Sequence, residues 1–170
     1  IGLLIVRVEY RRKGVGALLM RSAIDDLLGH GVETIKLEAV PKIANLYRKL
    51  GFVDEYDSLR FSGNFQNFTS QVSSNIKSLN KNTIEKIAEF DAEYFGANRN
   101  DVLTRLYHDC PDFCFVSRCD AKIAGYIMCR KGQVGYRVGP WVCNPDNPQT
   151  PRDLMKKCIE AMGQNAKIYV

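Results

Sequence analysis

The chain has 170 residues, of which 45% are hydrophobic and 25% charged, so its composition is that of a globular protein with one ordinary domain or two small ones. Its 24 lysines and arginines exceed its 19 aspartates and glutamates only mildly, and the net charge of +5 suits a phosphate-bearing small ligand at least as well as nucleic acid. Disordered and fibrous chains are excluded, as is a membrane span, because no apolar run approaches the roughly 20 residues that a transmembrane helix requires.

The first sixty residues have the pattern strand, loop, helix, strand. An apolar and β-branched run from Leu3 to Val8 is typical of a buried strand. A basic loop containing glycines follows at residues 9–16, and residues 14–28 then carry hydrophobic side chains at helical spacing. A second strand is predicted from Thr34 to Ala39.

The loop between the first strand and the helix has the properties of a phosphate site. Gly14 and Gly16 leave the backbone open to an anion where a helix presents unpaired N–H groups and partial positive charge. Arg11, Arg12 and Lys13 add positive charge at the same place, as a pyrophosphate would require. The glycines alone fit a tight turn with solvated basic side chains equally well. Neither a Walker loop nor the dinucleotide-binding fingerprint fits this spacing.

Two motifs in this region resemble those of one protein family. Arg11-x-x-Gly14-x-Gly16 resembles the (Q/R)-x-x-G-x-(G/A) acetyl-coenzyme A signature of the GNAT superfamily of N-acetyltransferases. The segment from Leu37 to Phe52 resembles the closing motif of that family, in which a short helix carrying Leu-Tyr ends in Leu-Gly-Phe. Two signatures in order are more specific than either alone. The chain therefore resembles a GNAT of the tandem-domain type, which implies an α/β (α+β) fold with a mixed sheet flanked by helices.

The resemblance implies that acetyl-coenzyme A is the acyl donor substrate and indicates which residues bind it. In proteins of this kind the pantetheine arm enters the gap beside the first strand, and the pyrophosphate lies on the amides of the loop. The cofactor-binding residues predicted in this way are Val6, Val8, Arg11, Arg12, Lys13, Gly14, Val15, Gly16 and Ala17. Catalysis would be direct transfer, in which an amine attacks the thioester, a backbone N–H of the strand stabilises the oxyanion, and coenzyme A leaves as a thiolate.

The resemblance also places Tyr47 at the family's position for the general acid. A thiolate leaving group benefits from a proton donor, and a tyrosine hydroxyl, with an ordinary pKa of about 10, keeps its proton at neutral pH. Tyr47 also has the helical spacing of a packing residue. Val40 departs from the family, since many relatives carry an asparagine there. Glu9 and Glu38 are acids near the expected cleft, and each is either a general base or a solvated carboxylate.

The rest of the chain predicts the end of one domain and the beginning of another. Val53 to Phe61 alternates like two closing strands, and the polar stretch after it indicates a linker. Further helices are predicted at 82–95, 100–110 and 151–162, with strands at 113–117, 122–130, 134–143 and 166–170. The predicted organisation is the C-terminal half of a first GNAT domain in residues 1–62, a linker in 63–81, and the N-terminal part of a second, degenerate GNAT domain in 82–170.

The last strand, helix and strand repeat the order of the first ones at an offset of about 130 residues. The loop of this second copy, residues 144–151, has three prolines and no glycine, and prolines remove amide donors that a pyrophosphate would use. We therefore predict that the second domain binds acetyl-coenzyme A poorly or not at all. Tyr136, Arg137 and Trp141 lie on its strand and either line a pocket or pack.

Six cysteines lie in the later part of the chain, without a C-x-x-C pair or a preceding signal peptide, and we expect reduced thiols in a cytoplasmic protein. A zinc site at Cys110, Cys114 and Cys119 is disfavoured because the last two, five residues apart on a predicted strand, point to opposite faces. No metal is expected. Because Ile1 already lies in a strand pattern and the last residues form another, we expect a piece of a longer protein.

These features favour an N-acetyltransferase that transfers the acetyl group of acetyl-coenzyme A to an amine of a small molecule or a protein. The alternative is a non-catalytic module that binds acetyl-coenzyme A or another metabolite, as the departure at Val40 and the degenerate second loop would suit. Nucleic-acid binding is disfavoured because the basic residues are scattered, apart from Arg11 to Lys13, and lack interleaved aromatics. We expect no nucleic-acid or membrane partner, and a monomer or a homodimer.

Overall fold

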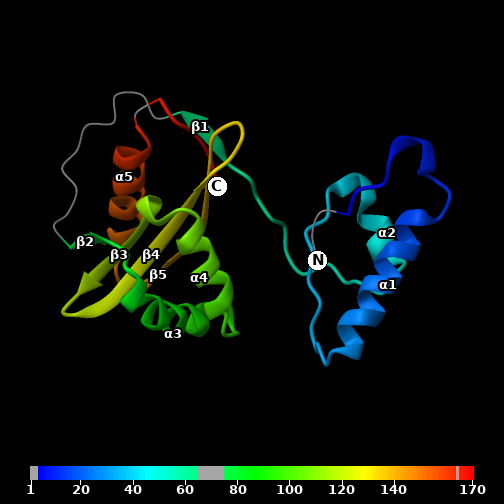
Figure 1. The fold of residues 1–170 in the computed structure, drawn as a ribbon, viewed down its shortest axis with the longest axis horizontal. Coiled ribbons are helices and arrows are strands. Elements are labelled where there is room, and N and C mark those ends of the chain that lie inside the picture. Colours follow the sequence, from blue (N-terminus) through cyan, green and yellow to red (C-terminus); the bar gives the residue numbers. More distant parts are fainter. Residues whose placement is uncertain (1–3, 65–74, 164) are drawn as a thin grey trace. The chain divides into compact units, whose positions relative to one another are not determined.

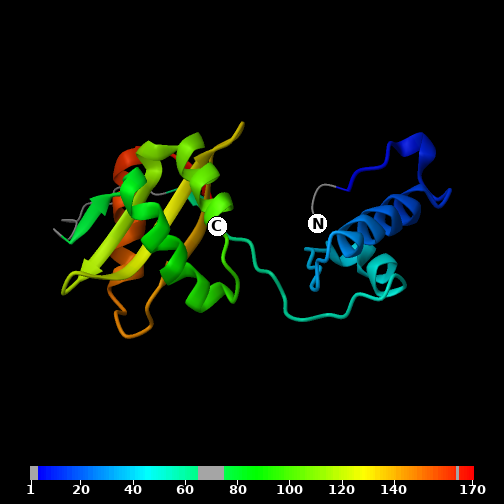
Figure 2. The same ribbon diagram turned by 60° about the horizontal axis from the view of Figure 1, so that its bottom comes forward.

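The computed structural model describes residues 4–64, 75–163 and 165–170 of the chain. The chain divides into two compact units, Ile1–Leu59 and Arg60–Val170. Figures 1 and 2 show that the described residues of the first unit form helices joined by loops, whereas those of the second form a sheet with helices on both faces.

The first unit contains one long helix and one short one. Helix α1 spans Val15–Gly29, as the hydrophobic spacing predicts. Helix α2 is a short helix, Ala44–Arg48, that follows the 3-10 turn Pro41–Ile43. Another 3-10 turn, Val8–Tyr10, precedes the loop that leads into α1.

The segments predicted as strands in the first sixty residues form no paired strand in their described parts. Residues 4–7, 34–39 and 53–60 belong to no β-ladder, although each segment has the side-chain pattern of a strand. Phe61 is the exception, because it exchanges two backbone hydrogen bonds with Val170 beside the β1–β6 pair. That pattern predicts an extended backbone, but a strand forms only where another segment pairs with its N–H and C=O groups. The prediction of strands from Leu3 to Val8, Thr34 to Ala39 and Val53 to Phe61 is therefore wrong for the described residues, apart from Phe61.

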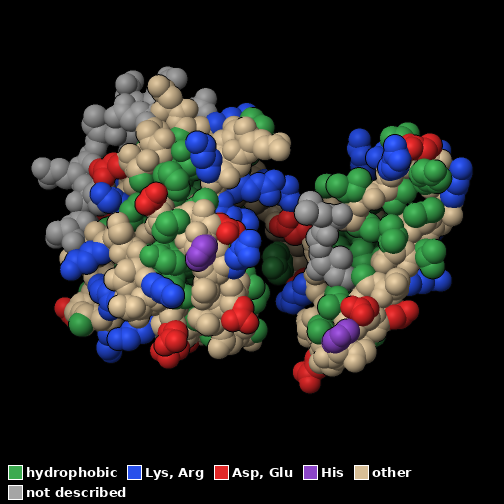
Figure 3. Space-filling model, viewed as in Figure 1, with side chains coloured by type: hydrophobic (Ala, Val, Ile, Leu, Met, Phe, Trp, Pro, Cys, Tyr) green, Lys and Arg blue, Asp and Glu red, His purple; other side chains and the backbone are tan. Residues whose placement is uncertain are grey.

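Hydrophobic side chains of the first unit are exposed as a result. Val53 is 88% exposed and Ile5 is 75% exposed, and Figure 3 shows hydrophobic side chains spread over the visible surface of this unit. Met20 on α1 and Tyr47 on α2 are the only hydrophobic side chains that are buried among its described residues. The first unit therefore has little core of its own.

The second unit is built on a six-stranded mixed sheet in the order β1-β6-β5-β4-β3-β2. Neighbouring strands are antiparallel except β5 and β6, which pair in parallel only at the beginning of β5. The strands are β1 (Ser62–Asn64), β2 (Ile76–Ser78), β3 (Cys114–Cys119), β4 (Lys122–Lys131), β5 (Tyr136–Cys143) and β6 (Lys167–Tyr169). The helices are α3 (Ile84–Phe95), α4 (Asn100–Asp109) and α5 (Thr150–Met162). This confirms the predicted mixed sheet flanked by helices.

The predicted linker 63–81 is not entirely a loop. Strand β1, which begins at Ser62, pairs with β6, and β2 pairs with β3, so the two ends of this stretch form opposite edges of the sheet. Residues 65–74 of the predicted linker lie outside the described residues. Short edge strands of polar residues are paired through their backbone, so their side chains carry little signal of the pairing.

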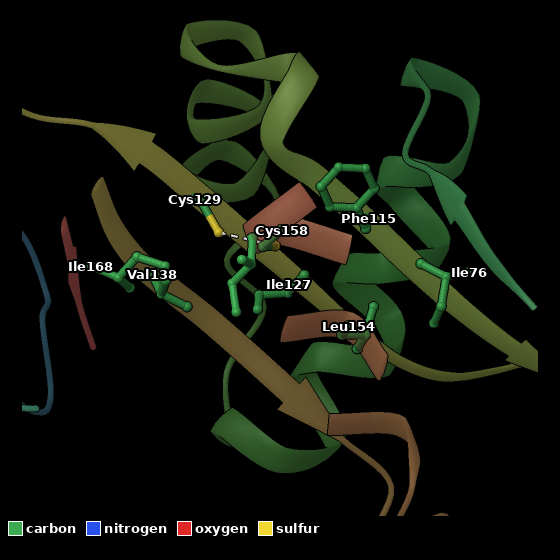
Figure 4. Packing of buried hydrophobic residues seen from close by; sticks show 9 residues of the cluster. Ile76, Phe115, Ile127, Cys129, Val138, Leu154, Cys158 and Ile168 are labelled. Carbon is green, nitrogen blue, oxygen red and sulfur yellow. Dashed lines mark hydrogen bonds between the residues drawn. The ribbon is translucent and has the colours of Figure 1, made fainter. Parts of the chain in front are cut away.

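Both faces of the sheet are covered by hydrophobic clusters. Ile127 and Cys129 on β4 belong to the cluster on the α5 face, which Figure 4 shows, and there the thiol of Cys129 lies 3.3 Å from that of Cys158. Tyr126 and Met128, which alternate with them, belong to the cluster under α3 and α4. Strand β4 is therefore buried on both sides, which explains its continuous apolar sequence.

A buried polar network lies inside the second cluster. The carboxylate of Asp91, fully buried on α3, accepts hydrogen bonds from Arg99 Nε at 2.6 Å and Arg99 Nη2 at 2.9 Å, and from the hydroxyl of Tyr126. Burial alone would raise the pKa of Asp91, but the hydrogen bonds from Arg99 and Tyr126 outweigh it and hold the pKa below its ordinary value. The network joins α3, the start of α4 and β4.

Candidate functional site

A pocket of about 570 Å³ lies within the first unit. Residues 4–6 form one side, the loop and the first turn of α1 form another, and the turn leading into α2 completes it. It contains eight of the ten site residues predicted from the sequence: Val6, Arg11, Arg12, Gly14, Val15, Gly16, Ala17 and Tyr47. Segments more than 35 residues apart in sequence thus meet at one place.

Two predicted site residues do not line this pocket. Val8 is 72% exposed in the turn before the loop, and Lys13 extends its ammonium over the ring of Tyr10, 5.7 Å from the centroid. The pocket lining gives no support to the roles predicted for Val8 and Lys13, and the roles of the eight lining residues also stay predictions.

Four hydrophobic residues line the pocket that the sequence analysis did not single out. Leu4 and Ile5 precede Val6, and Ile43 and Leu46 lie within one turn before Tyr47. Their closeness in sequence to predicted site residues is a signal that could have identified them. They give the pocket an apolar wall opposite its basic loop.

The loop has a backbone that suits glycine and leaves helix amides unpaired. Gly14, which precedes α1, has a φ of +81°, a left-handed conformation that favours glycine. The first backbone bond of the helix runs from Leu18 N to Gly14 O at 3.0 Å, so the amides of residues 15–17 have no partner within the helix. Those same residues line the pocket. The arrangement presents N–H groups and the positive end of a helix dipole to an anion.

Arg11 connects the loop to the opposite wall. Its Nε donates a hydrogen bond to the carbonyl oxygen of Val6 at 2.9 Å. The Val6 side chain also lies near the helix start, because a Cβ placed on Gly16 would lie 3.6 Å from Val6 Cγ2. With Arg12 on the same lining, the loop side of the pocket is positively charged.

Tyr47 both packs and lines the pocket. It is only 6% exposed, and its ring meets that of Phe52 edge to face at 6.1 Å between centroids. Both alternatives drawn from the sequence, general acid and packing residue, are compatible with this position. The candidate bases lie elsewhere: Glu9 pairs with Arg7 at 3.2 Å, and Glu38 accepts a hydrogen bond from the hydroxyl of Ser58 at 2.6 Å.

The corresponding loop of the second unit, residues 144–150, presents fewer free donors. The amide of Thr150 bonds to Asn147 O at 3.0 Å and that of Asp153 to Gln149 O at 3.1 Å, while Pro151 has no N–H. A smaller pocket of about 280 Å³ beside this loop is lined mainly by polar residues of the loop and of the end of β3.

Two of the three residues singled out on β5 pack against hydrophobic neighbours. Trp141 lies against the cluster under α5, and the ring of Tyr136 meets that of Phe113 at 5.1 Å between centroids. Arg137 is exposed. The structure therefore supports the packing interpretation of Trp141.

Neither a metal cluster nor a membrane-spanning helix is found in the described part of the chain. No group of three or more His, Cys, Asp or Glu side chains there could hold a metal ion. Among the helices described, none has the length and apolar character needed to cross a membrane.

Sequence comparisons relate both units to known acetyltransferases. A family profile described as "Acetyltransferase (GNAT) domain" matches residues 87–170, and a second profile with the same description matches residues 1–54. The chain is 25% identical over 141 residues to the uncharacterized N-acetyltransferase YitH of Bacillus subtilis, and 24% identical over 139 residues to the holothin acyltransferase of a Pseudoalteromonas species. Each match covers 82% of this chain, but 49% and 46% of the two relatives, so the chain spans about half their length.

Solved structures show the same likeness. A crystal structure from Pyrococcus horikoshii, whose acetyltransferase assignment is itself unproven, matches with a TM-score of 0.77 at 25% identity, over 99% of this chain and 54% of that one. A GCN5-related N-acetyltransferase from Kribbella flavida matches with a TM-score of 0.57 at 16% identity, over 99% of this chain and 44% of that one. The second match concerns the fold alone. Both matches include the residues of both units.

Proposed function

Because the chain belongs to the GNAT family of acetyltransferases, we propose that its first unit binds acetyl-coenzyme A and serves the direct transfer of the acetyl group to an amine of a small molecule or a protein. The observation that carries the proposal is the pocket of the first unit, where a basic, amide-presenting loop faces an apolar wall and a tyrosine. The activity is that of an acyl-coenzyme A-dependent N-acyltransferase.

The loop side of the pocket suits the diphosphate of the donor. The unpaired amides of residues 15–17 and the guanidinium groups of Arg11 and Arg12 offer hydrogen-bond donors and positive charge within one lining. Gly14 permits the left-handed turn that aims the chain into α1, and a side chain there would be strained. The donor set is therefore that of an anion site.

The apolar side suits the pantetheine arm and the thioester. Leu4, Ile5 and Val6 on one side and Ile43 and Leu46 on the other would remove that arm from water. Acetyl-coenzyme A supplies the thioester carbonyl that an amine attacks. Tyr47 lines the same pocket, and its hydroxyl would donate the proton that a departing thiolate needs.

We propose that the second unit is a degenerate GNAT domain in tandem with the first and does not bind acetyl-coenzyme A. Its loop has prolines at positions 145, 148 and 151 and uses the amides of Asn147 and Thr150 internally. A role in shaping the acceptor site or in stability fits a domain that retains the sheet without the anion site.

The test is calorimetric titration of acetyl-coenzyme A into the wild-type protein and two matched variants. Gly14→Asp and Gly31→Asp add the same charge at glycines with nearly the same φ, +81° and +79°, and a Cβ added at either position would have no neighbouring atom within 4 Å. Gly31 does not line the pocket. We expect saturable binding near one per chain, weakened about 100-fold or more by Gly14→Asp and less than about threefold by Gly31→Asp.

Absence of binding, or equal losses in the two variants, would overturn the assignment of the pocket. Release of free thiol from acetyl-coenzyme A in the presence of a panel of amines then tests transfer. Binding without transfer to any amine would favour the non-catalytic metabolite-binding alternative.

A further inference from the structure

We infer that Arg11 is a positioning residue. Its Nε holds residues 4–6, which form one wall of the pocket for the pantetheine arm, while its two terminal nitrogens remain for the diphosphate. This inference rests on the proposed function of the pocket. It assigns Arg11 a role beyond its charge, because its hydrogen bond to Val6 joins the two sides of the pocket.

The geometry makes Arg11 the closing contact of a small loop. Its Nε lies 2.9 Å from the carbonyl oxygen of Val6, five residues earlier, and both residues line the pocket. Inside that loop, Tyr10 N bonds to Arg7 O at 3.0 Å and Arg11 N bonds to Val8 O at 3.2 Å. The Arg11 side chain therefore extends from a turn whose backbone is already hydrogen-bonded, so its starting point is restrained when it bonds to Val6.

The wall that Arg11 holds has few other restraints. Residues 4–7 belong to no β-ladder in the described structure, and Ile5 is 75% exposed. The Val6 side chain lies near the start of α1 at Gly16, but this proximity involves the side chain and does not fix the direction of the carbonyl. Loss of the Arg11 bond would let residues 4–6 move away from the helix start.

The guanidinium can serve both sides at once. It carries five N–H donors in a planar fork, and the bond to Val6 uses only the Nε one. Its terminal nitrogens make no hydrogen bond or ion pair with the residues that the structure describes. A lysine keeps the charge but offers a single ammonium at one point, so it cannot span the carbonyl and a phosphate in the same way. The conservative replacement therefore separates charge from positioning.

The experiment measures the affinities of two ligands for the same proteins by calorimetry. The ligands are coenzyme A and adenosine 3′-phosphate 5′-diphosphate, which has the phosphates but lacks the pantetheine arm. The proteins are the wild type, Arg11→Lys and Arg11→Met, with Arg21→Lys and Arg21→Met as controls. Arg21 is an exposed residue of α1 outside the pocket lining, so its replacements make the same side-chain changes in the first unit away from the pocket.

We expect the ratio of the affinity for coenzyme A to that for adenosine 3′-phosphate 5′-diphosphate to fall about three- to tenfold in Arg11→Lys. The reason is that residues 4–6, which contact the pantetheine arm in the proposed complex, lose their hydrogen bond while the positive charge at position 11 stays. Arg11→Met should weaken both ligands and lower the ratio as well. The Arg21 variants should keep the ratio within about twofold of the wild type. In the ligand-free protein, amide hydrogen exchange at Tyr10 and Arg11, whose N–H groups bond to the carbonyls of Arg7 and Val8, should accelerate in both Arg11 variants and remain unchanged in α2.

An unchanged ratio in Arg11→Lys, with both affinities falling by the same factor, would overturn the inference and leave Arg11 as a charge contact only. That result would leave the proposed function intact. If the wild-type protein binds neither ligand, the proposed function itself fails, and the inference fails with it. Circular dichroism of each variant checks that the exposed substitution leaves the helices in place.

Discussion

The first unit buries only Met20 and Tyr47 among the hydrophobic side chains of its described residues, whereas the second contains two clusters of nine buried residues each, one on each face of a six-stranded sheet. Yet the first unit has the basic glycine loop and the larger pocket, and the loop of the second is interrupted by prolines. The same predicted order of strand, loop, helix and strand is therefore found with a pocket and little core in the first unit, and with a packed sheet in the second.

The difference arises because a phosphate loop and a sheet depend on contacts of different range. The loop requires a left-handed glycine, a helix start and nearby cations, all within about ten residues. A sheet requires partners that are distant in sequence, such as β1 and β6, whose paired residues are more than 100 positions apart. Anion-binding chemistry can therefore be encoded where a core is nearly absent.

The largest expected contrast between the units is in the cost of removing a hydrophobic side chain. Leu154→Ala, at a fully buried position on α5, should lower the free energy of unfolding of the second unit by about 2–5 kcal/mol, because it leaves a cavity in a packed cluster. Val53→Ala, at a position 88% exposed, should change stability by less than about 0.5 kcal/mol. Urea unfolding followed by the fluorescence of Trp141, the single tryptophan, measures the second unit, and amide hydrogen exchange in α1 measures the first. Equal costs would contradict the difference in packing.

The buried polar network gives the next contrast, between an interior and a surface ion pair. Arg99→Met should cost about 2–3 kcal/mol, because it leaves the buried carboxylate of Asp91 without its charged partner. Arg105→Met removes a comparable pair with Asp109, where the arginine side chain is 80% exposed, and should cost less than about 0.5 kcal/mol. The same urea titration compares them, and a small loss in Arg99→Met would show that the network adds little.

The network also predicts how the second unit responds to acid. Burial raises the pKa of Asp91, but the hydrogen bonds from Arg99 and Tyr126 lower it by more than burial raises it. The carboxyl of the folded protein therefore has a pKa below the ordinary 3.8. The unfolded chain then binds the proton first, and this stabilisation is present above about pH 4 and is lost as the pH falls through the folded pKa. The urea midpoint, measured from about pH 6 to about pH 3, should fall less steeply in Asp91→Asn than in the wild type. Parallel slopes would argue against a role for Asp91.

The smallest expected effect is that of one neutral donor. Tyr126→Phe removes the hydroxyl that donates to Asp91 but keeps the buried ring, so it should cost about 1 kcal/mol. Its neighbour on the same strand, Met128, offers a volume-conserving control in Met128→Leu, which changes packing without touching the network. If Tyr126→Phe costs no more than this control, the hydroxyl contributes nothing measurable.

Most elements of the second unit could be predicted from the sequence. The helical spacing in 84–95 and 150–162, and the apolar runs at 114–119 and 122–131, correspond to elements of the structure. Each of these signals is carried by side chains that repeat along one segment, with the period of a helix or the apolar content of a buried strand. The strand order, and the polar edges β1 and β2, leave no such repeat.

The network around Asp91 shows another limit. Asp91 and Arg99 stand eight residues apart in the sequence, on α3 and just before α4, and Tyr126 lies 35 residues beyond Asp91. Nothing in the composition or spacing of these residues distinguishes them from solvated surface charges, because burial depends on which helix packs against which strand. The carboxylate and its partners were therefore not predicted.

The residues of the candidate site divide in the same way. The signature from Arg11 to Gly16 and the motif around Tyr47 could be read from the linear order of residues, because left-handed glycines, helix starts and cations act within a few positions of one another. The apolar wall of Leu4, Ile5, Ile43 and Leu46, the bond from Arg11 to Val6, and the lack of a strand partner for residues 4–7 depend on the folded chain. The wall joins segments that are remote in sequence, and whether a side chain bonds or a strand pairs depends on what else is packed there.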